Sequence, residues 1–213
     1  MKQATRTALA AMAILAALST ASITVAAPVK YTVDKAHTEL GFGVRHFFST
    51  VNGRFGDFTG TIVFDAADPS KISVEGTAVT ASVTTDNAKR DAHLQTPDFF
   101  DAANHPTLTF KSTKVTAAGK NKYKVAGDLT MRGVTKPVVF EGEFLGSGSV
   151  AMGGQGSGVK AGFKATTVVN RKDFGINWNK ALDNGGMVLG DEVTLTLQIE
   201  ANQVSDDSAA NAK

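Results

Sequence analysis

Residues 192–200 are Glu-Val-Thr-Leu-Thr-Leu-Gln-Ile-Glu, and every second one from Val193 to Ile199 is apolar. This two-residue period is typical of a β-strand with one dry face and one wet face. Strands of a parallel sheet are buried on both faces and do not alternate in this way. The run therefore predicts a strand of an antiparallel sheet.

The same alternation recurs along the chain, in about ten runs of which some are parts of one bent strand. The apolar members of these runs keep one parity: Leu40, Phe42, Val44; Phe58, Ile62, Phe64; Leu108, Phe110; Tyr123, Val125, Leu129, Met131; Val138, Phe140, Phe144; Val159, Ala161, Phe163, Ala165. Turn-forming segments separate the runs at 65–70, 118–121 and 132–133. Glycines inside the runs, at Gly60, Gly76, Gly127 and Gly142, suggest bends or bulges.

A sheet of this size with one apolar face either splits into a sandwich or closes into a barrel. Eight strands close around an interior that side chains fill or that holds one small ligand. The chain has 13 phenylalanines but two tyrosines and one tryptophan, so the inner surface is expected to be dry. This suits a pocket for a hydrophobic molecule. A solid core would use the same residues, and composition alone slightly favours it.

Residues 86–104 break the strand pattern because they are polar and rich in helix formers. Thr85 or Asp86 is placed to cap a helix start, and Thr96-Pro97 offers a second start. We expect one or two short helices that cover an open end of the sheet. The glycine- and serine-rich segment 147–158 is interpreted as a mobile loop.

The first 26 residues have the three-part layout of a secretory signal. Lys2 and Arg6 precede an apolar core from Ala8 to Leu18, and small residues lead to a cleavage site after Ala26. That core is too short to cross about 30 Å of hydrocarbon at ~1.5 Å per residue. The sequence therefore predicts a cleaved signal peptide (1–26), a barrel domain (27–202) and a disordered tail (203–213), with no stable membrane insertion.

Composition excludes several classes of function. Without Lys2 and Arg6, the basic and acidic residues are equal in number at 20 each, so the chain as a whole has no broad electrostatic basis for binding nucleic acid or anionic lipid. The absence of cysteine rules out disulfides and thiol catalysis. The four histidines are dispersed, so no metal site is predicted.

A set of short motifs has the order and spacing of a known family. They are Tyr31-Thr32-Val33-Asp34 with His37, Phe42-Gly43-Val44-Arg45-His46, Val51-Asn52-Gly53-Arg54-Phe55, Phe58-Thr59-Gly60, Arg90-Asp91-Ala92-His93-Leu94, Pro97-Asp98-Phe99-Phe100-Asp101, Pro106 with Phe110-Lys111-Ser112, Gly127-Asp128-Leu129-Thr130, Gly133-Val134-Thr135-Lys136-Pro137 and Asp173-Phe174-Gly175-Ile176. Together they resemble the YceI-like family over about residues 29–201. The long loop at 146–158 is the main departure.

This resemblance implies an all-β, lipocalin-like, eight-stranded antiparallel β-barrel in the periplasm. It also implies that the interior binds a long polyisoprenoid or a similar amphiphile, which the protein would sequester or transport. No cofactor is expected, and a bound isoprenoid or isoprenoid quinone would be the ligand. The resemblance supplies no catalytic mechanism, and we expect a protein that is not an enzyme.

The expected ligand-binding residues are inward members of the alternating runs, each of which could equally be a simple core residue. They are Phe42, Val44, His46, Phe58, Ile62, Phe64, Phe110, Val125, Leu129, Phe140, Phe144, Phe163, Leu195 and Leu197. His46 shares the inward parity, so it could meet a polar headgroup or be a hydrogen-bonded histidine near the barrel mouth.

Arg90, Asp91, His93 and Asp98 form the densest polar cluster. One alternative is an enzyme that uses Arg90, Asp91 and His93 on a lipid or quinone, since a carboxylate near a histidine can perform acid–base chemistry. The structural interpretation, which we favour, is that the cluster pins the helix across the barrel end. A third alternative is an envelope-stress interaction module with a filled core. The sequence leaves open whether the chain forms a homodimer.

Overall fold

The computed structural model describes residues 27–149, 158–183 and 185–205. The expected signal peptide lies outside these residues, as do 150–157 of the expected loop and 206–213 of the expected tail. The strands are β1 (Val29–Val33), β2 (Glu39–His46), β3 (Ser49–Phe55), β4 (Phe58–Phe64), β5 (Ser73–Val79), β6 (Val83–Thr84), β7 (Thr107–Gly119), β8 (Lys122–Met131), β9 (Val134–Ser149), β10 (Val159–Asn170) and β11 (Leu189–Gln203). The helices are α1 (Ala88–Leu94) and the 3-10 turns η1 (Lys35–His37), η2 (Pro69–Lys71), η3 (Thr80–Ser82) and η4 (Arg171–Phe174).

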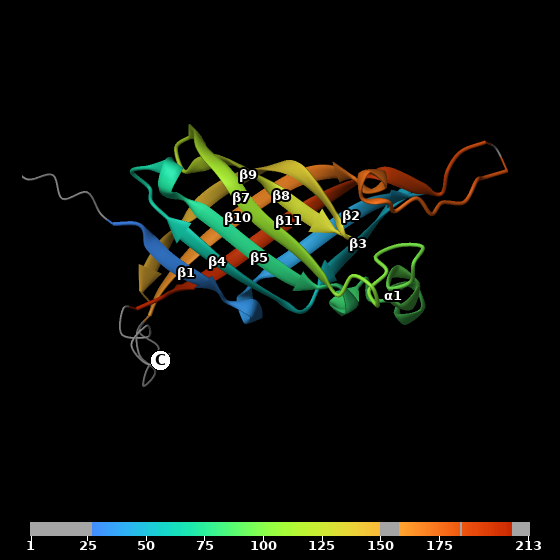
Figure 1. Cartoon of the computed structure of the whole chain (residues 1–213), viewed down its shortest axis with the longest axis horizontal. Helices are drawn as coiled ribbons and strands as arrows, with labels where there is room; N and C mark the ends of the chain where they lie inside the picture. The colour runs from blue at the N-terminus through green and yellow to red at the C-terminus, as the bar shows by residue number, and fades with distance from the viewer. Residues whose placement is uncertain (1–26, 150–157, 184, 206–213) are drawn as a thin grey trace, which may run out of the picture.

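The strands form one closed antiparallel barrel (Figure 1). Three pairs of consecutive short strands each act as one bent strand: β1 with β2, β3 with β4, and β5 with β6. Thus β1 and β2 both pair with β11, and β4 and β3 pair with β1 and β2 respectively. Each of the eight resulting strands pairs with its neighbours in sequence, and the pairing of β11 with β1 closes the ring. The prediction of an eight-stranded antiparallel barrel is confirmed.

The register puts the apolar parity on the inner face. Phe42 lies opposite Leu195 on β11, and Val125 on β8 lies opposite Phe140 on β9. Cross-strand partners share a face of the sheet, so one inward residue fixes the direction of its partner. The predicted turn at Arg132-Gly133 is a two-residue hairpin in which both residues have positive φ, at 53° and 72°. That geometry matches the twist of the flanking strands and favours glycine.

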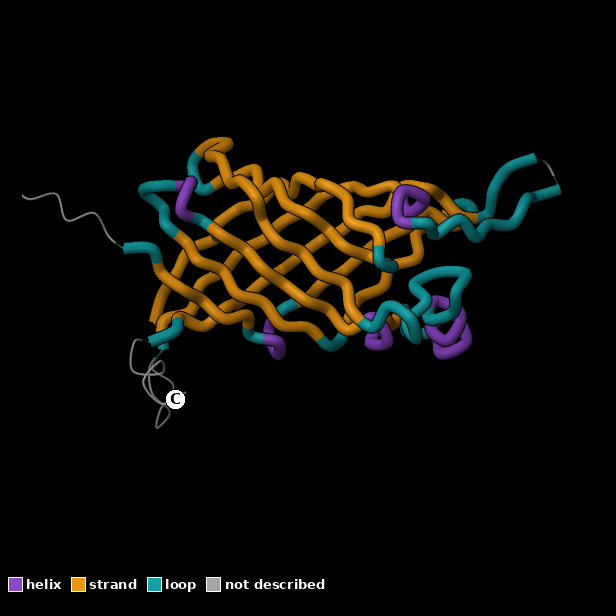
Figure 2. The backbone as a smooth tube through the Cα atoms, viewed as in Figure 1, coloured by secondary structure: helices purple, strands orange, loops and turns teal. Residues whose placement is uncertain are grey.

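One end of the barrel carries the longer connections, and we call it the helical end. It holds the β2–β3 turn, the segment 85–106 with α1, and the β10–β11 connection with η4 (Figure 2). Asn87 caps α1 by accepting a hydrogen bond from the Arg90 amide, so the prediction of Thr85 or Asp86 as the cap is wrong. After Leu94 the chain forms hydrogen-bonded turns, such as Phe99 N–H to Thr96 O, and not a second α-helix.

Strand ends also differ from expectation. β9 runs to Ser149, so the first part of the expected loop at 147–158 is strand. β11 includes Gln203, and the Val204 amide donates to Lys30 O.

Candidate ligand-binding site

Two buried apolar clusters lie toward the two ends of the interior. At the end with the β4–β5 and β7–β8 connections, Phe64 packs on Phe144 and Phe163 with ring centroids 4.4 and 5.4 Å apart. Tyr31 and Tyr123 meet the same group edge-on. We call these five aromatics the packed end. At the helical end, a second cluster takes members such as Phe99 and Phe174 from the connections.

Between these clusters lies a cavity of about 670 Å³, lined almost wholly by apolar atoms. The interior is therefore hollow and not a solid core. All the residues expected to face the interior line this cavity: Phe42, Val44, His46, Phe58, Ile62, Phe64, Phe110, Val125, Leu129, Phe140, Phe144, Phe163, Leu195 and Leu197. Their role in binding a ligand stays a prediction.

Small residues lie at inward positions in the middle of the barrel, and we call this part the waist. Gly60 pairs with Gly76 between β4 and β5, and Gly142 pairs with Ala165 between β9 and β10. A Cβ atom at Gly142 would lie no closer than 3.6 Å to its neighbours, so a larger side chain has room there. Glycine in a strand interior often marks a place where something must approach closely.

The sequence interpretation of these glycines is wrong in part. Gly60, Gly76 and Gly142 keep regular pairing with their neighbours and mark no bulge. Gly127 does lie beside a register shift, because it pairs with Ser112 and the shift falls between Ser112 and Lys114. It also has a packing role, because a Cβ atom there would lie 2.5 Å from the Phe110 ring. Another register shift falls between Gly162 and Phe163.

Polar side chains line the cavity at the helical end. Lys89, Arg90 and His93 come from α1, and His46 comes from the last position of β2. Arg90 is held in place because its Nε donates to Thr85 Oγ1 at 2.7 Å and its Nη2 donates to Thr85 O at 3.0 Å. His46 lies against the Phe47 ring, with centroids 4.9 Å apart.

The Asp91 and His93 side chains bond to different partners. Both Asp91 carboxylate oxygens accept hydrogen bonds from Thr84 and Thr85. Burial raises the pKa of Asp91, but the hydrogen bonds from Thr85 outweigh it and hold the pKa below its ordinary value.

His93 bonds instead to Asp98 at 2.9 Å and packs edge-on against Trp178. The bond between Asp91 and Thr84 ties α1 to β6, and the contact between His93 and Trp178 ties it to the β10–β11 connection. Both agree with the structural interpretation of the cluster.

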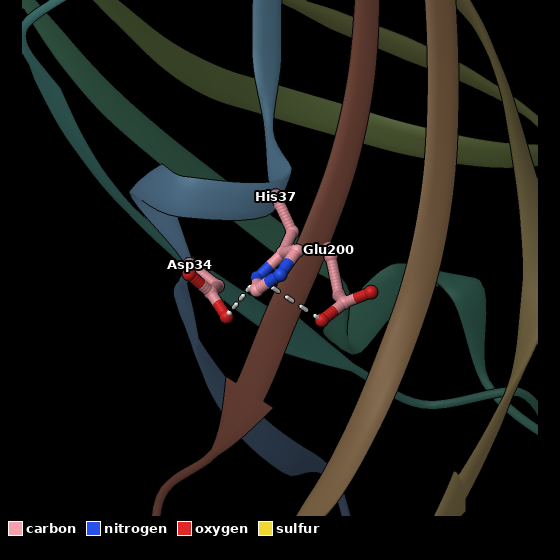
Figure 3. A group of neighbouring side chains, drawn as sticks. All are labelled: Asp34, His37 and Glu200. Carbon is pink, nitrogen blue, oxygen red and sulfur yellow. Dashed lines mark hydrogen bonds and ion pairs between the residues drawn. The ribbon is translucent and has the colours of Figure 1, made fainter.

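A second polar group lies outside the cavity, where η1 interrupts the bent strand. His37 Nδ1 is 3.0 Å from Asp34 Oδ2 and 3.7 Å from Glu200 Oε1 (Figure 3). One ligand atom from each residue could meet a metal ion. However, the Lys160 ammonium already bonds both carboxylates, at 2.8 Å in the case of Asp34. The group is thus an ion-pair network that fastens η1 to β10 and β11.

Sequence reasoning missed Arg171, a cavity-lining residue that is 4% exposed. Its guanidinium donates to the carbonyl oxygens of Gly190, Ile176 and Trp178 and to the Asp191 carboxylate. Burial lowers its pKa, and Asp191 opposes that shift. Arg171 therefore anchors the two ends of the β10–β11 connection to each other.

Other lining residues were missed for different reasons. Leu40 and Ile199 keep the alternating parity, so the pattern already contained the signal for them. Phe100 and Trp178 come from irregular connections, where no period predicts the direction of a side chain.

Comparison with known proteins agrees with this architecture. Residues 31–201 match the family model described as the YceI-like domain. The chain belongs to the YceI-like family. A UPF0312 protein of Pseudomonas paraeruginosa is 39% identical over 193 residues, which cover 90% of this chain and 95% of that relative.

Solved structures include other YceI-like barrels. The Campylobacter jejuni YCEI protein is 35% identical with a TM-score of 0.62, and the match covers 82% of this chain and 98% of that one. A polyisoprenoid binding domain from Saccharophagus degradans has a TM-score of 0.61 at 13% identity, covering 83% and 99%. At that identity the likeness is one of fold alone.

The described part of this YceI-like chain contains no helix with the length and apolar character needed to cross a bilayer.

Proposed function

We propose that this protein is an exported, non-enzymatic carrier that takes up a long hydrophobic chain of isoprenoid type in its cavity. The observation that carries the proposal is the apolar cavity of about 670 Å³ at the waist. Small-molecule sites in proteins typically have volumes of about 300–1,000 Å³ and mostly apolar walls.

The apolar lining of the cavity argues that it holds a ligand. A hydrocarbon chain that fills the space would make dispersion contacts with apolar walls that otherwise have no partner atoms beside them.

The apolar wall suits a hydrocarbon chain better than a polar ligand. Each buried methylene contributes about 0.8 kcal/mol, so affinity grows with chain length until the waist is full. The neighbour from Saccharophagus degradans, whose name describes polyisoprenoid binding, supports an isoprenoid as the occupant. Its low identity leaves the headgroup and the chain length to experiment.

Export is part of the proposal and rests on the signal-like pattern of residues 1–26. Mass spectrometry of the periplasmic fraction should find a chain that begins at Ala27. Intact chain that remains in the cytoplasm would contradict export, but it would not bear on the proposal that the cavity binds a hydrophobic chain.

Ligand binding is tested by isolating the protein from the envelope of a bacterium that exports it. Native mass spectrometry and analysis of an organic extract should reveal one isoprenoid-like molecule per chain. The stripped protein should then take up a prenol supplied in cyclodextrin. The absence of any bound lipid, together with no uptake from prenols or isoprenoid quinones, would overturn the proposal.

A further inference from the structure

The β2–β3 turn exposes two consecutive phenylalanines at the helical end. Phe48 is fully exposed, and Phe47 is 39% exposed. Exposed apolar residues also occur singly on the barrel wall, where they need no explanation. Phe47 and Phe48 differ because they are adjacent and sit at the outermost point of a hairpin.

The backbone gives no reason for phenylalanine in this turn. Phe47 has a φ of 51°, in the left-handed region that disfavours residues with a Cβ atom. In a two-residue hairpin turn, glycine or asparagine is the usual residue with positive φ. The chain thus keeps a large apolar side chain where both the backbone and the solvent disfavour it, and such positions cluster at functional sites.

The neighbouring connection adds apolar and basic groups to this tip. The Phe47 amide donates to Val188 O, next to the exposed side chain of Met187. Arg45 lies beside the turn and donates to Phe47 O. We call Phe47, Phe48 and Met187, with Arg45 at their side, the apolar tip.

The charges around the tip are mostly unpaired. Within 27–149, 158–183 and 185–205, no carboxylate lies within ion-pair distance of Arg45 or Lys180. Lys180 is linked to the tip because its carbonyl accepts from the Val188 amide. Asp183 is the acidic residue of the same segment. Arg45 and Lys180 are therefore basic groups without a carboxylate at ion-pair distance among the described residues, while Glu39, Asp191 and Glu192 line the same outer groove as Arg45.

The tip is continuous with the cavity. His46, which lines the cavity, precedes Phe47 and meets its ring edge-on. It pairs with Leu189 of β11, another lining residue. The tip and α1 lie at the same end of the barrel (Figure 1). A molecule that left a surface in contact with the tip would thus meet the cavity-lining residues of the helical end first.

We propose that the apolar tip docks on the surface of a lipid bilayer with anionic headgroups, and that the cavity is loaded and unloaded there. Aromatic and apolar side chains enter the boundary between headgroups and acyl chains, while Arg and Lys meet the anionic lipids. The inference rests on the proposed function, because a water-insoluble chain must pass between the cavity and a membrane.

The test uses protein expressed from the full chain, with its N-terminus determined, and flotation with phosphatidylcholine–phosphatidylglycerol vesicles. Phe48→Ser should lower vesicle affinity by about ten- to a hundredfold, as expected for losing one buried phenylalanine. The control is Leu145→Ser on β9, which removes a side chain that is 58% exposed on the barrel wall and should leave affinity unchanged. Arg45→Gln should weaken binding only to vesicles that contain phosphatidylglycerol.

In flotation, docking would be overturned by no binding of the wild-type protein, by unchanged binding of Phe48→Ser, or by an equal loss in Leu145→Ser. Prenol uptake from cyclodextrin separates this inference from the proposed function, because that route needs no membrane. Phe48→Ser should take up prenol normally from cyclodextrin and slowly from vesicles. Normal uptake from both sources would overturn docking alone, whereas no uptake by the wild-type protein from cyclodextrin would overturn the carrier function.

Discussion

The packed end and the waist are built by the same strands, yet one is full and the other is hollow. On β9, Phe144 belongs to the packed end and Gly142 to the waist, two positions apart on the same face. On β10, Phe163 and Ala165 repeat this contrast. The alternation of apolar and polar residues therefore builds the barrel, and the size of the inward side chains determines whether its interior is filled.

The largest loss of stability is expected from a substitution at the packed end. Phe64→Ala should lower the free energy of unfolding by about 3–5 kcal/mol, because its ring is buried among Tyr123, Phe144 and Phe163. Leu197→Ala should cost less than about 2 kcal/mol, since Leu197 is only partly buried whereas Phe64 is 7% exposed. Urea unfolding measures both. Equal losses in the two variants would contradict the conclusion that the packed end is filled and the waist is hollow.

A substitution at the helical end should lower stability nearly as much, because it removes buried hydrogen bonds. Arg171→Met removes a buried guanidinium and leaves the carbonyls of Gly190, Ile176 and Trp178 without their donor. We expect a loss of about 3 kcal/mol in the free energy of unfolding. Lys172→Met, which removes an exposed ion pair to Asp191, is the control and should cost little. A small effect of Arg171→Met would show that the connection is held by its apolar residues instead.

Much of this contrast could be predicted from the sequence. The alternation from Val193 to Ile199 and its repeats predicted the antiparallel barrel and the inward residues, because a two-residue period fixes the direction of every side chain in a strand. Gly142 shares the parity of Phe140 and Phe144, so its inward direction was also available, although it was interpreted as a bend or bulge.

Other features depend on contacts that no local pattern encodes. Arg171 reaches carbonyls in an irregular connection, and Glu200 joins Asp34 and His37 only after the barrel closes. Asn87 caps α1 in place of the predicted Thr85, whose hydroxyl group is hydrogen-bonded to Asp91 and Arg90. Local capping preference alone could not choose among neighbouring candidates.

A side chain that fills the waist should lower ligand uptake without lowering the stability of the fold. Gly142→Leu places a side chain in the hollow, where a Cβ atom meets Val125 at an ordinary 3.6 Å. We expect unfolding free energy to stay the same or rise by up to about 1 kcal/mol, since glycine weakens strands, while prenol uptake falls sharply. The outward control Val139→Leu should change neither quantity. Normal uptake by Gly142→Leu would mean that the waist is not the binding region.

The smallest effect concerns pH and the network at η1. The Lys160 ammonium, with a further hydrogen bond from His37, holds the pKa of Asp34 well below its ordinary value. A lowered pKa in the folded chain stabilises it at neutral pH, and this contribution is lost as pH falls below about 4. The Tm of Asp34→Asn should therefore fall less steeply with acid than that of the wild type. An identical pH profile would contradict the ion-pair assignment.

A crystal structure of the protein purified from its native envelope would show whether the waist holds a hydrophobic chain. Elongated, continuous density should lie between the Gly60–Gly76 pair and the Gly142–Ala165 pair, in contact with inward side chains such as Phe140. An interior in which those side chains close over the waist and leave no space for a chain would contradict the proposal that the waist holds one.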